Sequence, residues 1–139
     1  ILLSKLWEQK KSPDHWDVPV SEEHEATWTK LASDIEGLSA LSFPRESFSS
    51  DSEMDLVLFC DASTSAYGYV AYAVQGGKSN LVLAKAKVAP LKKRSLPQLE
   101  LLGALTGVQG LLSLLNCFNN VKNIFVGLDA QICLSWITS

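Results

Sequence analysis

Three runs of apolar residues in the middle of the chain follow the two-residue alternation of β-strands. They are Leu56–Cys60, Tyr67–Val74 and Leu81–Val88. Between the second and third runs, Gln75–Asn80 (QGGKSN) has the composition of a hairpin turn. In the third run Lys85 and Lys87 alternate with apolar residues, which is typical of a strand with one exposed face. The pattern therefore predicts three antiparallel strands in meander order.

Helical spacing of apolar residues predicts helices on both sides of these strands. The predicted helices are Ile1–Lys11, Ser21 to about Gly37 or Leu41, Ser95–Phe118 and Ala130–Ile137. A buried strand, Ile124–Leu128, lies between the last two helices. Ser12–Val20 is expected to be a loop, and Ser42–Asp55, rich in Ser and acidic residues, a linker. The order of the later elements predicts an α/β domain that continues past the end of this chain.

The long predicted helix separates its polar residues from its one charged residue. A narrow stripe, taken as the solvent face, holds Gln98, Thr106, Gln109, Ser113 and Asn116. Glu100 lies about 170° from the centre of this stripe and is predicted to face the sheet, together with the small Ala104 and Gly107 and with Leu111. The uncharged segment Leu101–Val121 is also long enough for a membrane helix. Its polar residues favour a helix buried on a sheet.

The composition is that of a folded domain from a reducing compartment. Apolar residues make up 47% of the 139 residues and charged residues 19%, which excludes a disordered tail. Three cysteines form no C-x-x-C pair and cannot all join in disulfides, so we expect an intracellular protein. No signal peptide is visible, and the first residue is Ile1, so we expect a piece of a longer protein.

Carboxylates are scarce in the C-terminal part of the chain. Residues 1–55 contain 12 of the 15 acidic residues, and the other three are Asp61, Glu100 and Asp129. Each has an ordinary explanation: a turn at Asp61, a helix N-cap at Asp129, and protonation or an ion pair for Glu100. However, Asp61 and Asp129 each directly follow an apolar strand. If those strands are neighbours, all three carboxylates meet at one edge and predict a site for Mg²⁺ or Mn²⁺.

Basic residues form a second group. Residues 78–94 contain no acidic residue and six basic ones, which are Lys78, Lys85, Lys87, Lys92, Lys93 and Arg94. Lysines on an exposed edge strand explain part of this group without any ligand. A basic strand and turn that lead into the helix with Glu100 would also draw phosphates toward a metal site. The tyrosines Tyr67, Tyr69 and Tyr72 are interpreted as packing residues.

Five segments carry a family resemblance. They are Phe59–Ser63 (FCDAS), Ala66–Tyr72 (AYGYVAY), Ala84–Lys92 (AKAKVAPLK), Leu96–Leu101 (LPQLEL) and Leu128–Ile137 (LDAQICLSWI). In this order and spacing they resemble the ribonuclease H domain of BEL/Pao-type LTR retrotransposon Pol polyproteins. Leu6-Trp7 and Trp16-Asp17 resemble the segment that joins reverse transcriptase to that domain.

The resemblance implies a ribonuclease H-like α/β fold, with a mixed sheet of three antiparallel strands plus a parallel strand, flanked by helices. It implies hydrolysis of the RNA strand of RNA–DNA hybrids during reverse transcription, with two Mg²⁺ or Mn²⁺ ions in the complete site. The implied catalytic residues and metal ligands are Asp61, Glu100 and Asp129. The residues expected to contact nucleic acid are Ser63, Lys87, Lys92, Lys93 and Arg94.

Two departures from the family pattern leave an alternative open. The third motif reads Leu128-Asp129-Ala130 and lacks the two hydroxyl groups of the usual T-D-S. The resemblance also places a fourth carboxylate, a last strand and a last helix after Ser139. The alternative is a non-catalytic, degenerate or domesticated module that binds nucleic acid or protein.

The resemblance also implies a wider context. Residues 1–50 would be a connection segment after a reverse transcriptase domain, and residues 51–139 the ribonuclease H-like domain. An integrase would follow in the same polyprotein, and the substrate partner would be an RNA–DNA hybrid, with no membrane. The expected location is the cytoplasm, within a virus-like particle, or the nucleus.

Overall fold

The computed structural model describes residues 1–9, 17–42, 48–49 and 51–138 and divides the chain into two compact units, Ile1–Arg45 and Glu46–Ser139. The first unit contains two helices, α1 (Leu2–Gln9) and α2 (Glu22–Gly37), and α2 continues into a short 3-10 helix, η2 (Leu38–Ala40). Both predicted N-terminal helices are therefore confirmed. Most of the predicted loop and part of the predicted linker lie outside the described residues.

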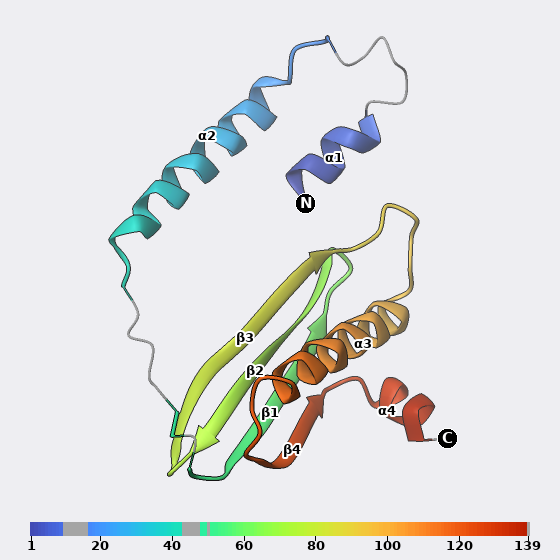
Figure 1. The fold of residues 1–139 in the computed structure, drawn as a ribbon. Helices are drawn as coiled ribbons and strands as arrows, with labels where there is room; N and C mark the ends of the chain where they lie inside the picture. Colours follow the sequence, from blue (N-terminus) through green and yellow to red (C-terminus); the bar gives the residue numbers. More distant parts are fainter. Residues whose placement is uncertain (10–16, 43–47, 50, 139) are drawn as a thin grey trace. The chain divides into compact units, whose positions relative to one another are not determined.

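The second unit is built on a mixed sheet of four strands (Figure 1). The strands are β1 (Met54–Ala62), β2 (Ala66–Gln75), β3 (Lys78–Val88) and β4 (Val121–Leu128). Their order is β3-β2-β1-β4; β1 pairs with β2 and β2 with β3 in antiparallel fashion, whereas β4 is parallel to β1. This arrangement confirms the predicted α/β fold with three antiparallel strands and one parallel strand.

All four strands begin earlier than their apolar runs predict, β2 by a single residue. The hairpin turn consists only of Gly76 and Gly77, whose φ angles of 59° and 78° suit glycine, so β3 already begins at Lys78. Polar pairs extend β1 and β4: Asn123 donates to Asp55 at 2.9 Å, and Lys122 forms an ion pair with Glu53 at 2.6 Å. The predicted linker therefore ends before Met54. Helix α3 ends at Leu115 and not at the predicted Phe118, so the break before β4 covers residues 116–120 and not the predicted 119–123.

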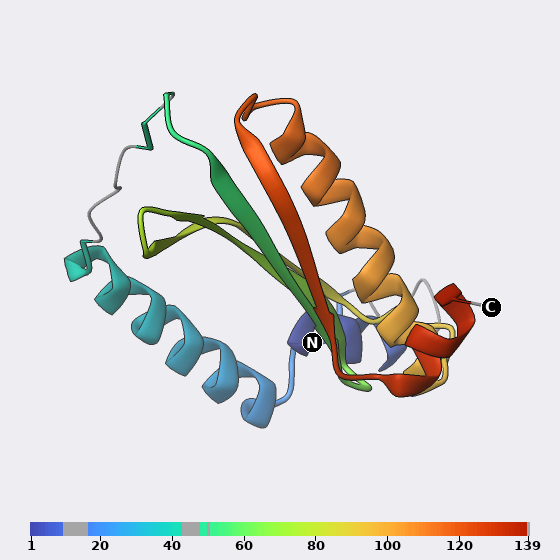
Figure 2. The same ribbon diagram turned by 90° about the horizontal axis from the view of Figure 1, so that it is seen from below.

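Helix α3 (Leu96–Leu115) packs lengthwise on one face of the sheet, over β1 and β2 (Figure 2). The core between them contains Leu56, Leu58, Cys60, Ala71, Ala73 and Leu111. Glycines allow the close approach: a Cβ atom at Gly107 would lie 2.5 Å from the Cys60 sulfur, and one at Gly110 would overlap the Tyr69 ring. The predicted sheet-facing group of Glu100, Ala104, Gly107 and Leu111 is buried as expected.

The same helix is long and apolar enough to cross a membrane, by length and composition alone. In the structure this helix packs on β1 and β2, as expected for a helix buried on a sheet. Of the predicted solvent stripe, Thr106 is half-buried and the other four residues are exposed. A second exposed stripe is apolar and was not predicted; it consists of Leu101, Leu105, Val108 and Leu112.

Strand β4 departs from its predicted burial. Ile124, Phe125 and Val126 are 43–54% exposed, although their continuous apolar run predicts a strand covered on both faces. The physical reason is position: β4 lies at the edge of the sheet, and α3 packs over β1 and β2, so the faces of β4 are left largely uncovered among the described residues. The final helix, α4 (Gln131–Thr138), follows β4 directly and confirms the predicted helix.

Candidate metal centre

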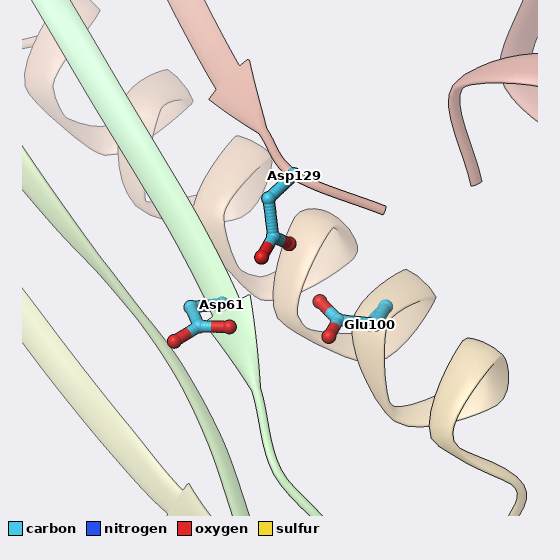
Figure 3. A group of neighbouring side chains, drawn as sticks. All are labelled: Asp61, Glu100 and Asp129. Atoms are coloured by element: carbon cyan, nitrogen blue, oxygen red, sulfur yellow. The ribbon is translucent and has the colours of Figure 1, made fainter. Parts of the chain in front are cut away.

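Three structural elements bring Asp61, Glu100 and Asp129 together. Asp61 is the penultimate residue of β1, and Asp129 follows the last residue of β4. Because these strands are parallel and adjacent, with Cys60 opposite Leu128, their carboxyl ends meet at one edge of the sheet. Glu100 comes from the start of α3. The three side chains point toward one another, as predicted (Figure 3).

The geometry suits hard cations. One oxygen from each carboxylate lies within 4.8 Å of the others. Opposite oxygen ligands of a single Mg²⁺ ion stand about 4.2 Å apart, so a small closure would bring all three onto one ion, and the spread also suits a pair of ions. The donor set contains only carboxylate oxygens, which favour Mg²⁺ or Mn²⁺ over softer metals.

Glu100 is the most informative member of this group. It is only 6% exposed, and its Oε2 atom is buried without a hydrogen-bond partner. Burial raises the pKa of its carboxyl group, and the nearby charges of Asp129 and Asp61 raise it further. The Ala62 N–H group acts in the opposite direction. A buried carboxylate with one unpartnered oxygen and two other carboxylates beside it costs free energy that a bound cation would offset.

A turn at Asp61, an N-cap at Asp129 and an ion pair for Glu100 do not account for this arrangement, whereas the raised pKa of Glu100 agrees with its other ordinary explanation, protonation. Within the described part of the chain, no basic side chain forms an ion pair with any of them. Asp129 accepts no hydrogen bond from the start of α4 among those residues, so it does not act as an N-cap there. Asp61 accepts a 2.7 Å bond from the adjacent Ala62 N–H, whereas the β1–β2 turn is held by Ser63.

Two buried cysteines next to the centre were not predicted. Cys60 precedes Asp61, and its pKa is raised to about 11 by burial and by the charge of Glu100. Cys133, on α4, is also buried, and its thiol donates to the Pro97 carbonyl at 3.3 Å. Both are therefore neutral, poorly nucleophilic thiols at pH 7, which makes this wall of the site apolar. The position of Cys60 beside Asp61 was the only sequence signal.

The predicted nucleic-acid contacts lie on the segments next to the carboxylates. Lys92, Lys93 and Arg94 are exposed in the segment between β3 and α3, and Lys87 is exposed on β3. The Ser63 hydroxyl accepts hydrogen bonds from Ser65 and Ala66 N–H groups, so it shapes the turn beside Asp61. Contact of these residues with nucleic acid stays a prediction.

The fold and the three converging carboxylates agree with the comparisons with known proteins. No curated protein matches the chain. A family model described as the Pao retrotransposon-like RNaseH-like domain matches residues 1–130, and therefore includes all three carboxylates. The match also extends across both compact units. The chain thus belongs to the family of Pao retrotransposon-like RNaseH-like domains.

Proposed function

We propose that this chain acts in the hydrolysis of the RNA strand of RNA–DNA hybrids during reverse transcription, with Asp61, Glu100 and Asp129 as catalytic metal ligands. The observation that carries the proposal is the buried Glu100 carboxylate, whose Oε2 atom has no hydrogen-bond partner and which lies against two further carboxylates. Membership in a retrotransposon RNaseH-like family supports a nucleic-acid substrate.

The chain's own residues would contribute position and charge. The parallel pairing of β1 and β4 holds Asp61 and Asp129 side by side, and the packed helix α3 fixes Glu100 against them. The three negative charges would attract two Mg²⁺ or Mn²⁺ ions, and the bound ions would relieve the repulsion among the carboxylates. Ions bound there would supply the Lewis acidity that activates the attacking water and stabilises the leaving 3′ oxygen.

The proposed context is a Pol polyprotein. Residues 1–50 would connect a reverse transcriptase to the ribonuclease H-like residues 51–139, and an integrase would follow. We propose action in the cytoplasm, within a virus-like particle, or in the nucleus. The basic residues Lys87, Lys92, Lys93 and Arg94 would hold the hybrid, with affinity that falls as salt rises because counterions are released.

The experiment is release of labelled RNA from an RNA–DNA hybrid in Mg²⁺ or Mn²⁺, with duplex DNA as the control substrate. It compares the 139-residue chain with a version extended past Ser139 into the parent polyprotein, where the resemblance places a fourth carboxylate. We expect the extended version to cleave, and the shorter chain to cleave poorly. An extended, folded protein that binds hybrid but cuts nothing would refute the enzymatic proposal.

That outcome would favour the second candidate, a non-catalytic nucleic-acid-binding module. The observation in its favour is the third motif, Leu128-Asp129-Ala130, where apolar residues flank the carboxylate. Replacement of Leu128 and Ala130 by Thr and Ser separates the two candidates. If the extended protein is inactive and this double variant cleaves, the missing hydroxyl groups explain the loss.

A further inference from the structure

A groove of about 320 Å³ runs between β3 and α3 in the second unit. Its polar lining consists of Tyr69 on β2, Lys85 and Lys87 on β3, and Thr106, Gln109 and Ser113 on α3. These residues are separate from the three carboxylates of the candidate metal centre. The predicted solvent stripe of α3 therefore forms one wall of this groove.

The orientation of the two lysines is unexpected. In the register of the sheet, Lys85 lies opposite Tyr69 and Lys87 opposite Tyr67. Tyr69 is buried beneath α3, next to Gly107 and Gly110, so Lys85 and Lys87 lie on the face of the sheet that α3 covers. The small Ala84 and Ala86 occupy the open face. A strand that only kept its edge soluble would place its lysines on that open face.

The groove offers hydrogen-bond donors and positive charge but no opposing charge. Among the described residues, no carboxylate forms an ion pair with Lys85 or Lys87. Tyr69 is 9% exposed and its ring packs against Gly110, and no hydrogen bond to its hydroxyl group occurs in that part of the chain. Thr106 and Ser113 already donate to helix carbonyls at 2.7 and 3.1 Å. The free donors are therefore the two ammonium groups, the Tyr69 hydroxyl and the Gln109 amide.

The groove also has a defined relation to the metal centre. Asp61, Gly68 and Ala86 form one row across β1, β2 and β3, so the backbone of Ala86 lies about 10 Å from that of Asp61, which corresponds to two strand spacings. This row faces the open side of the sheet and the two lysines face α3, so a ligand reaches from the lysines to the carboxylates around the end of the strands. Lys85 and Lys87 flank Ala86 and are about 7 Å apart along the strand. A polymer with regularly spaced negative charges could contact both lysines while another part of it lies at the carboxylates.

We propose that this groove binds the phosphodiester backbone of the hybrid, at a position beside the strand segment that enters the metal centre. The inference rests on the proposed function for the identity of the ligand. Two lysines contribute charge, and Tyr69 and Gln109 donate hydrogen bonds to phosphate oxygens. The groove thus holds the duplex in register without reading its sequence.

The test is binding of a fluorescein-labelled 18-base-pair RNA–DNA hybrid to the full chain in EDTA, measured by anisotropy at several salt concentrations. The double variant Lys85→Gln/Lys87→Gln should bind about tenfold more weakly, and the slope of log affinity against log salt should fall by about 2. Tyr69→Phe should weaken binding about threefold with the slope unchanged. The matched control Lys78→Gln/Lys122→Gln removes two lysines from the opposite end of the sheet and should leave the slope unchanged.

Equal slopes for the wild type and the groove double variant, with both proteins folded by circular dichroism, would overturn the inference. If the groove instead binds an acidic protein segment, the double variant should lose affinity for polyglutamate but keep its affinity for the hybrid. That result would also overturn the inference. EDTA makes the result independent of the metal centre. If the extended protein does not cleave the hybrid, but the double variant still binds the hybrid more weakly than the wild type, the proposed function is refuted and the groove inference stands.

Discussion

Two clusters of like charge lie beside the same helix, and they are solvated in different ways. At the start of α3, three carboxylates converge around Glu100, which is 6% exposed. Along its flank, Lys85 and Lys87 line a groove and remain exposed. In the described residues, neither cluster has a partner of opposite charge. The buried cluster costs far more free energy than the solvated one, because water screens the lysines but not Glu100.

This difference indicates what each cluster can do. A preorganised group of carboxylates around one buried member, Glu100, suits a small cation that can replace the lost hydration and that stays bound through a reaction. Exposed lysines suit a large polyanion that binds and leaves, with an affinity controlled by salt. The comparison therefore supports the proposals of chemistry at the acidic end of α3 and of substrate positioning along its basic flank.

The largest expected effect separates chemistry from binding. In the extended protein, Asp61→Asn should lower kcat for RNA release by about a thousandfold or more, because a metal ligand is lost. Lys85→Gln/Lys87→Gln should instead raise KM about tenfold and leave kcat nearly unchanged. Steady-state cleavage kinetics measure both. A groove variant that loses kcat as severely as Asp61→Asn would erase the distinction between the two clusters.

The second effect concerns stability without divalent ions. Glu100→Gln removes a buried charge that two carboxylates repel, so the free energy of unfolding at pH 7 in EDTA should rise by about 1–2 kcal/mol. Urea denaturation measures this change. Asp129→Asn is a useful comparison, because it relieves the same repulsion from an exposed position and should stabilise less. A destabilised Glu100→Gln protein would show that hydrogen bonds or a counterion stabilise the charged Glu100 carboxylate in the folded protein.

The third effect is the pH dependence of the difference in the free energy of unfolding between Glu100→Gln and the wild type. The pKa of Glu100 is raised in the folded protein, so the folded state holds this proton more tightly than the unfolded state. Stability from this group is therefore fully present below its ordinary pKa and is lost as pH rises through the folded value. The gap between Glu100→Gln and wild type should be small near pH 4 and widen toward pH 7. A stability difference that stays constant with pH would contradict the raised pKa of Glu100 in the folded protein.

The smallest effect is expected at the basic flank. Because Lys85 and Lys87 are exposed, Lys85→Gln/Lys87→Gln should change the free energy of unfolding by less than about 0.5 kcal/mol. Urea denaturation under the same conditions as for Glu100→Gln gives the direct comparison. A large loss of stability would mean that the lysines support the packing of α3, and binding data for this variant would then need a milder substitution.

The sequence predicted the metal centre better than the groove, for a physical reason. Glu100 is the only charged residue of a long helix, so helical periodicity alone places it opposite the polar stripe. Asp61 and Asp129 each end an apolar strand, and parallel pairing of neighbouring strands then places them together. These predictions depend on strong contrasts between charged and apolar residues.

The side of β3 that carries the lysines could not be predicted in the same way. The pairing of β2 with β3 shifts between Ala71 and Tyr72, so Leu81 lies opposite Tyr72 but Leu83 lies opposite Ala71. An extra residue of this kind reverses the alternation of faces, and local sequence does not reveal it. Alanine and lysine also alternate without a strong signal for either face. The packing of α3 over Tyr69 decides the orientation.

The measurement that tests the central claim most directly is Mn²⁺ binding to the 139-residue chain, followed by isothermal titration calorimetry. Wild type should bind Mn²⁺, Glu100→Gln and Asp61→Asn should each bind at least about tenfold more weakly, and Lys85→Gln/Lys87→Gln should match wild type. Because the readout is binding, it does not depend on cleavage. No binding by wild type, or equal binding by Glu100→Gln, would contradict the assignment of these carboxylates as a metal centre.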